Sequence, residues 1–119
     1  MRTILLIEDD EATLQVAAET LRATGYRVVA AADFQAAFEF FDSGEAVDLM
    51  ITDIRMPPGT PHGFAMARMA RSRRPGLKIL YMTGYRDIPP SEAADAAGKV
   101  IRKPVKPEEL IAEVGLALA

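Results

Sequence analysis

Three carboxylates stand directly after short apolar runs of the sequence. Glu8 and Asp9 follow the run Thr3–Ile7, and Asp53 follows the run Val47–Thr52. Neighbouring carboxylates repel one another and attract a hard cation, and Mg²⁺ is typically held by one or two carboxylates together with waters and a phosphate oxygen. If the two runs are strands that end at one edge of a sheet, the three carboxylates converge. We therefore expect a Mg²⁺ site there.

Asp53 also has the chemistry of a phosphoacceptor. A carboxylate can act as a nucleophile and form an aspartyl phosphate, and Thr83 and Lys103 stand at the ends of two further apolar runs. A lysine provides a mobile positive charge for phosphoryl oxygens, and a threonine hydroxyl can donate to them. Pro104 follows Lys103, and a cis bond there would fix the direction of the lysine. Each residue alone could have a purely structural role: the aspartate as a cap, the lysine as a solvated surface charge, and the threonine as a hydrogen-bonding partner of the backbone. Together they indicate phosphoryl chemistry.

The elements that must position these side chains alternate along the chain. Short apolar runs of the length of buried strands occur at Thr3–Ile7, Arg27–Ala30, Val47–Thr52, Leu77–Met82 and Lys99–Arg102. Apolar residues at helical spacing lie between or after them, at Glu11–Ala23, at 34–41, at Gly63–Ser72 and from Pro107 onward. Strand and helix in alternation indicate an α/β protein with a parallel sheet and right-handed crossovers.

Caps and stops in the sequence support these helices. Asp10 and Asp33 precede the first two helical patterns as N-caps, and Gly25 follows the first pattern as a C-terminal stop. The second helix has one predicted apolar face, made of residues three or four apart: Phe34, Ala37, Phe38 and Phe41. We expect the phenylalanines of this face to pack in the core.

An open, doubly wound sheet of flavodoxin-like type is the fold that this alternation favours. Five strands are too few for a (β/α)8 barrel, and a chain of 119 residues has room for one domain, residues 1–119. In open parallel sheets, ligands bind beyond the carboxyl ends of the strands. The candidate residues named above all fall at such ends, so we expect the chemistry at that edge.

Composition excludes several classes of function. The chain has no cysteine, which excludes disulfides, thiolate metal sites and cysteine nucleophiles. A formal net charge of −3 means that the chain lacks the excess of positive charge that is typical of proteins that bind nucleic acid. No apolar run approaches the roughly 20 residues that span a bilayer, so we expect no membrane segment and a cytoplasmic location.

The set Glu8-Asp9, Asp53, Thr83 and Lys103-Pro104, in this order and at these spacings, resembles the receiver domain of bacterial response regulators, the CheY-like superfamily. The resemblance covers essentially the whole chain and implies the strand order 2-1-3-4-5. It implies that Asp53 is phosphorylated, with Mg²⁺, from a phosphohistidine on a histidine kinase or phosphotransfer protein. The other implied roles are a direct metal ligand at Asp9, a water-mediated one at Glu8, a metal-binding backbone carbonyl at Arg55, and phosphoryl contacts at Thr83 and Lys103.

Two stretches depart from the usual receiver pattern. Val100 stands where receivers often carry an aromatic switch residue, shortly before Lys103. The run Tyr81-Met82-Thr83-Gly84-Tyr85 resembles a receiver subgroup with a Thr-Gly-Tyr signature and a reduced fourth helix. Because the stretch Gly84–Gly98 is short and contains Pro89-Pro90, we expect about two turns of helix there at most. We expect Tyr85 to serve as the switch residue.

The expected function is that of a stand-alone phosphoacceptor receiver in two-component or phosphorelay signalling, with output by partner binding or onward phosphotransfer. Its expected catalysis is limited to Mg²⁺-dependent self-phosphorylation and autodephosphorylation.

A receiver module of a hybrid histidine kinase has the same chemistry and is an open alternative. An aspartyl phosphatase is disfavoured because such enzymes usually carry a second Asp where this chain has Arg55. A flavin or nucleotide binder is disfavoured because no glycine precedes Ala23 to form a phosphate-binding loop.

Overall fold

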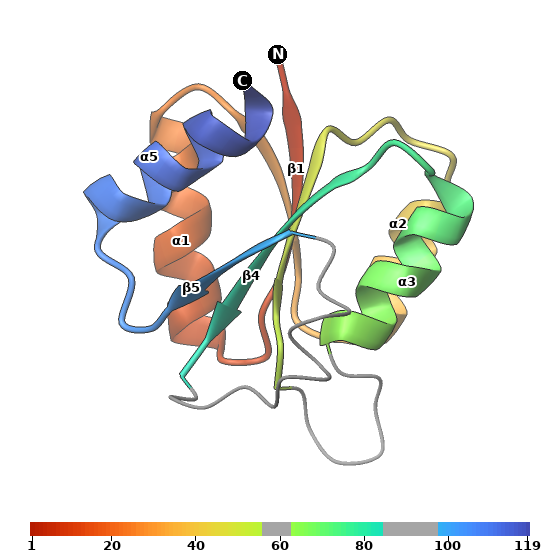
Figure 1. The fold of residues 1–119 in the computed structure, drawn as a ribbon, viewed down its shortest axis with the longest axis horizontal. Helices are drawn as coiled ribbons and strands as arrows, with labels where there is room; N and C mark the ends of the chain where they lie inside the picture. Colours follow the sequence, from red (N-terminus) through yellow and green to blue (C-terminus); the bar gives the residue numbers. More distant parts are fainter. Residues whose placement is uncertain (56–62, 85–97) are drawn as a thin grey trace.

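A computed structural model describes residues 1–55, 63–84 and 98–119 of the chain. In these residues, five parallel strands form one sheet in the order β2-β1-β3-β4-β5 (Figure 1). The strands are β1 (Thr3–Ile7), β2 (Arg27–Ala31), β3 (Leu49–Asp53), β4 (Lys78–Thr83) and β5 (Lys99–Arg102). This order and the parallel pairing confirm the predicted flavodoxin-like, doubly wound sheet.

The helices of the described part cover both faces of the sheet. They are α1 (Glu11–Ala23), α2 (Phe34–Asp42), α3 (Gly63–Arg73) and α5 (Pro107–Leu118). Helices α1 and α5 lie on one face, and α2 and α3 lie on the other (Figure 1). The expected short fourth helix and Tyr85 fall within residues 85–97, outside the described residues. No helix in the described part is both long enough and apolar enough to cross a membrane.

Helix boundaries follow from capping residues in the sequence. The Asp10 carboxylate accepts a hydrogen bond from the Thr13 N–H at 2.9 Å where α1 begins, and Asp33 accepts one from the Ala36 N–H at 2.8 Å where α2 begins. After α1, Gly25 has a φ of 104°, which residues with a Cβ rarely adopt. Glycine at this point lets the chain end the helix and turn back into β2.

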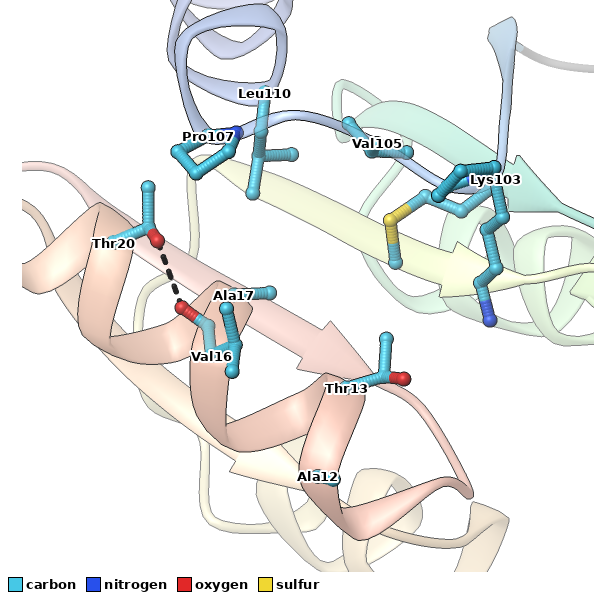
Figure 2. Close-up of a pocket in the computed structure, with 11 residues that line it drawn as sticks. Ala12, Thr13, Val16, Ala17, Thr20, Lys103, Val105, Pro107 and Leu110 are labelled. Carbon is cyan, nitrogen blue, oxygen red and sulfur yellow. Dashed lines mark hydrogen bonds between the residues drawn. The ribbon is translucent and has the colours of Figure 1, made fainter.

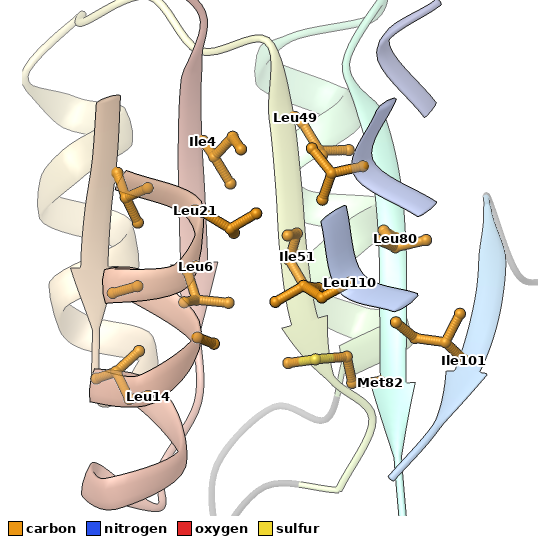
Figure 3. Close-up of a cluster of buried hydrophobic side chains, with 14 of the residues drawn as sticks. Ile4, Leu6, Leu14, Leu21, Leu49, Ile51, Leu80, Met82, Ile101 and Leu110 are labelled. Atoms are coloured by element: carbon orange, nitrogen blue, oxygen red, sulfur yellow. The ribbon is translucent and has the colours of Figure 1, made fainter. Parts of the chain in front are cut away.

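The sheet divides the apolar interior into two layers. All of β1 is buried, and its residues alternate between the two layers. Leu6 packs with Leu21 in the layer that α1 and α5 cover (Figure 3). Leu5 packs with Phe41 in the layer under α2 and α3. Each large aliphatic side chain that is fully buried contributes about 1.5–3 kcal/mol, so packing on both faces fixes β1 and its carboxyl end.

The face of α2 that contacts the core differs from the prediction. Ala37, Phe40 and Phe41 are buried, while Phe34 and Phe38 are only half-buried. The two half-buried rings pack edge to face, with centroids 5.6 Å apart. The prediction that Phe38 belongs to the core is therefore wrong, and Phe40 is buried instead. Both sets of residues have helical spacing, so the spacing alone could not identify the face that meets the sheet.

Two strands are displaced slightly toward the C-terminus from their predicted positions. β3 ends at Asp53 and β4 ends at Thr83, as expected for these two residues, although the predicted apolar runs Val47–Thr52 and Leu77–Met82 each stop one residue earlier. Asp53 pairs across the ladder with Met82, next to Thr83. Both residues are therefore held by the sheet itself rather than by a loop.

Candidate functional site

The candidate site lies at the carboxyl edge of the sheet, where four strands bring together side chains that the sequence predicted. Asp53 and Thr83 are the last residues of β3 and β4. Glu8 follows β1 directly, and Lys103 follows β5 directly. Because all the strands are parallel, their carboxyl ends meet at this edge.

The ammonium group of Lys103 joins two buried carboxylates. Its Nζ donates to Glu8 Oε2 at 2.5 Å and to Asp53 Oδ2 at 2.8 Å. Glu8 is 1% exposed and Asp53 is 7% exposed. The Lys103 N–H also donates to the carbonyl oxygen of Thr83 at 2.8 Å, and the Lys103–Pro104 peptide bond is cis. Two buried negative charges therefore share the positive charge of Lys103.

Burial and ion pairing shift the proton affinity of both partners. Burial raises the pKa of the Glu8 carboxyl above its ordinary value, although hydrogen bonds from Lys103 and from the Asp10 N–H act in the opposite direction. Burial alone would lower the pKa of Lys103, but its hydrogen bonds to Asp53 and Glu8 and their charges outweigh burial and raise it. Lys103 therefore stays charged at neutral pH, and Glu8 loses its proton less readily than an exposed glutamate does.

Three carboxylates at this edge could hold a metal ion. Glu8, Asp9 and Asp53 each offer an oxygen, and these oxygens lie within 4.8 Å of one another. Glu8 and Asp53 are buried, whereas Asp9 is exposed, so the cluster opens to solvent at Asp9. Carboxylate oxygens that leave room for water are the donors that suit Mg²⁺.

The phosphoacceptor candidate is held in a fixed orientation. Asp53 Oδ1 accepts a hydrogen bond from the Arg55 N–H at 3.2 Å, while Oδ2 is bound by Lys103. The Ile54 N–H donates to the carbonyl oxygen of Met82 at 3.0 Å, which ties the end of β3 to β4. Arg55, whose carbonyl is the predicted metal ligand, is exposed.

Comparison with known proteins identifies the family. The family model described as the response regulator receiver domain matches residues 4–115. The chain belongs to this family. It is a receiver domain of two-component signalling, as the residues at the sheet edge had indicated.

Individual relatives and structural neighbours agree with this assignment. The receiver is 33% identical to the response regulator receiver protein CpdR of Brucella abortus, over 96% of this chain and 94% of CpdR. It is 30% identical to the sensor kinase CckA of the same species, over 94% of this chain but only 12% of CckA. A CheY-like receiver domain protein from Methanospirillum hungatei has a TM-score of 0.88 at 29% identity, over 99% of this chain and 94% of that chain. The receiver domain of the hybrid histidine kinase CckA has a TM-score of 0.83 at 29% identity, over 98% of this chain and 99% of that one.

A groove opens beside Lys103 on the surface of the receiver (Figure 2). It has a volume of about 540 Å³ and lies between α1 on one side and, on the other, the start of α5 with the segment that joins β5 to it. Val16 and Ala17 of α1 form one side, and Val105 and Leu110 form the other. Val16 is 60% exposed. Sequence reasoning missed the groove because its two sides come from opposite ends of the chain.

Val100, which stands where receivers often carry an aromatic switch residue, is packed against the apolar interior. It is half-buried in β5, pairs with Tyr81 of β4, and packs against the layer under α2 and α3. Tyr81 is fully buried, and its ring meets that of Phe64 edge to face with centroids 4.9 Å apart. The aromatic side chain next to Val100 in the sheet therefore belongs to the core and comes from the interior strand β4. The sequence placed Tyr81 in an apolar run and in the Thr-Gly-Tyr stretch but did not predict its contact with Phe64.

Proposed function

We propose that this receiver accepts a phosphoryl group on Asp53 from a phosphohistidine. The observation that carries the proposal is the pair of hydrogen bonds from Lys103 Nζ to Asp53 and Glu8. A phosphoryl group brings a charge of about −2, and the ammonium group is in position to balance part of it. In the transfer, an Asp53 oxygen bonds to phosphorus as the P–N bond of the phosphohistidine breaks, and the imidazole leaves with the electron pair and takes up a proton.

Mg²⁺ is the cofactor that fits the donor set. In this proposal it is held by Glu8, Asp9 and Asp53, whose oxygens lie within 4.8 Å of one another, and by the Arg55 carbonyl. Bound Mg²⁺ neutralises charge on the phosphoryl oxygens. The chain's own contribution is the orientation of Asp53 by Lys103 and a hydrogen bond from the Thr83 hydroxyl to a phosphoryl oxygen.

Replacement of the phosphoacceptor tests the proposal directly. We expect Asp53→Asn to take up no phosphate from acetyl phosphate and Mg²⁺, as measured by the intact mass of the protein. Asp42→Asn is the matched control, because Asp42 is an exposed carboxylate on α2. It should be phosphorylated like the wild type. Undiminished uptake by Asp53→Asn would refute the assignment.

Metal binding is tested separately by calorimetry. We expect Asp9→Ala to weaken Mg²⁺ binding and phosphorylation more than Glu8→Ala does. The reason is that Asp9 is the proposed direct ligand, whereas Glu8 acts through water and already binds Lys103. Full phosphorylation in excess chelator would contradict a role for the metal.

The phosphodonor is proposed to be a histidine kinase or a histidine phosphotransfer protein. Such a donor must cover the surface around Asp53, and the apolar groove shares Lys103 with the site. Val16, which is exposed there, offers an apolar contact to a donor. We expect Val16→Glu to slow transfer from a donor protein while transfer from acetyl phosphate is unchanged. Equal slowing of both reactions would show that the substitution damages the site instead.

Two contexts for this chemistry remain as proposals. Similarity over 94% of CpdR favours a receiver that works through partner binding or onward phosphotransfer. Similarity to CckA favours the alternative, a receiver module of a hybrid histidine kinase. Beyond Mg²⁺-dependent self-phosphorylation and autodephosphorylation, we propose no enzymatic activity. Because the two contexts share the same chemistry, the gene that encodes the chain distinguishes them, and phosphotransfer profiling against histidine kinases and phosphotransfer proteins identifies the phosphodonor.

A further inference from the structure

Helix α3 begins with a residue that lies against the backbone of the phosphoacceptor. A Cβ added to Gly63 would lie 2.4 Å from the carbonyl oxygen of Asp53 and 2.8 Å from the Cα of Ile54. Real Cβ atoms essentially never approach other atoms this closely, and both neighbours are backbone atoms that cannot swing aside. At this position only glycine allows the helix and the end of β3 to remain where they are.

Hydrogen bonds hold the end of β3 between α3 and β4. The Gly63 N–H donates to the carbonyl oxygen of Ile54 at 2.8 Å. On the other side, the Ile54 N–H donates to the carbonyl oxygen of Met82 at 3.0 Å. The position of Asp53 and of the residues that follow it is therefore set jointly by α3 and by the neighbouring strand.

Helix α3 cannot easily move away to make room for a side chain at its first residue. Phe64 is buried, and its ring packs edge to face against Tyr81. Met66 and Ala67 are also buried in the layer under α2 and α3. Closely packed interiors transmit such a displacement rather than absorb it. A Cβ at Gly63 would therefore push against the backbone of Asp53 and Ile54, and part of the displacement would fall on the end of β3.

We propose that Gly63 is a positioning residue for metal binding and phosphoryl transfer. Its lack of a side chain lets α3 press against the end of β3, and this contact sets the location of the Asp53 carboxylate and the Arg55 carbonyl. The inference rests on the proposed function, because those two groups are proposed ligands of Mg²⁺. It extends that function by giving α3 a role in ordering the site.

Two glycine variants separate this role from a general loss of stability. Gly98 is the matched control, because a Cβ there would lie 1.8 Å from the carbonyl oxygen of Ile79, at the opposite end of the sheet. Gly76 is a second control, because a Cβ there would meet nothing within 4 Å. We expect Gly63→Ala and Gly98→Ala both to lower stability, and Gly76→Ala to have little effect.

The discriminating measurement is Mg²⁺ affinity under conditions in which each variant is folded. We expect Gly63→Ala to raise the Mg²⁺ dissociation constant about tenfold or more, as loss of the groups that support metal ligands does. It should also slow phosphorylation by acetyl phosphate, whereas Gly98→Ala should change neither property once the folded fraction is taken into account. Wild-type affinity in Gly63→Ala would overturn the inference. Failure of the wild type itself to bind Mg²⁺ or take up phosphate would instead overturn the proposed function.

A measurement on the wild type keeps the inference testable if Gly63→Ala does not fold. If α3 and the end of β3 form one unit with the metal site, added Mg²⁺ should slow hydrogen exchange of the Gly63 and Ile54 amides. The Leu77 amide, which donates to Arg74 at the opposite edge, is the internal control and should exchange at an unchanged rate. Unchanged exchange at Gly63 and Ile54 on saturation with Mg²⁺ would contradict the positioning role.

Discussion

Removal of the ammonium group from Lys103 should destabilise the metal-free receiver strongly. Lys103→Met keeps a long apolar stem but leaves Glu8 and Asp53 buried without the charge that now contacts both. Loss of one partner from a buried ion pair costs about 3–5 kcal/mol. The Lys103 side chain is 23% exposed, and water weakens the interaction accordingly. We therefore expect a loss of about 2–3 kcal/mol at pH 7, or a fall in Tm of about 10 °C for a domain of this size.

Urea unfolding in the presence of a chelator measures this effect. Lys99→Met is the matched control, because Lys99 pairs with Glu113 at 2.8 Å but is 63% exposed, so the loss should stay below about 1 kcal/mol. Adding Glu8→Gln to Lys103→Met removes one of the two uncompensated charges and should restore a large part of the stability. The reasoning is wrong if Lys103→Met costs no more than Lys99→Met, or if the double variant is as unstable as Lys103→Met alone.

Three further predictions concern stability in metal-free buffer. Burial raises the pKa of Glu8 in the folded state, so the contribution of Glu8 to the free energy of unfolding is most favourable at acid pH and is lost as pH rises through that raised pKa. Urea titrations should therefore show that the wild type loses stability relative to Glu8→Gln as pH rises over that range. Asp10→Ala removes the cap of α1 and should cost about 1 kcal/mol, measured in the same way. Leu21→Ala opens a cavity in the layer between α1 and the sheet and should lower the unfolding free energy by about 3 kcal/mol.

Most of the fold could be predicted because its elements have strong local patterns. The first and last strands and the helix Glu11–Ala23 have the bounds that were expected. The first strand and this helix combine a continuous apolar run or stripe with a clear cap or stop, so local sequence and tertiary packing agree. The second helix shows the limit of this reasoning. Its consecutive phenylalanines fit more than one apolar face, and the contact with the sheet selects Phe40 over Phe38.

The site was predictable in its membership but less so in its internal contacts. Glu8, Asp53, Thr83 and Lys103 could be assigned to one edge because strand ends in a parallel sheet converge. The sequence did not reveal that Lys103 bridges two buried carboxylates, since such a contact depends on the twist and register of four strands. Nor did it reveal the approach of Gly63 to β3, because a glycine that is required by a close backbone contact looks like any other glycine in a turn.

The burial of Tyr81 has a practical consequence for spectroscopy. The chain has three tyrosines and no tryptophan, so its near-ultraviolet signals come from tyrosine and phenylalanine alone. Tyr81 is fully buried against Phe64, the residue next to Gly63, and it lies on the strand that ends at Thr83. A fixed ring in an asymmetric packed environment gives rise to near-ultraviolet circular dichroism, which changes when the neighbouring ring shifts. We therefore expect Tyr81 to serve as an intrinsic optical probe of the packing between β4 and the start of α3.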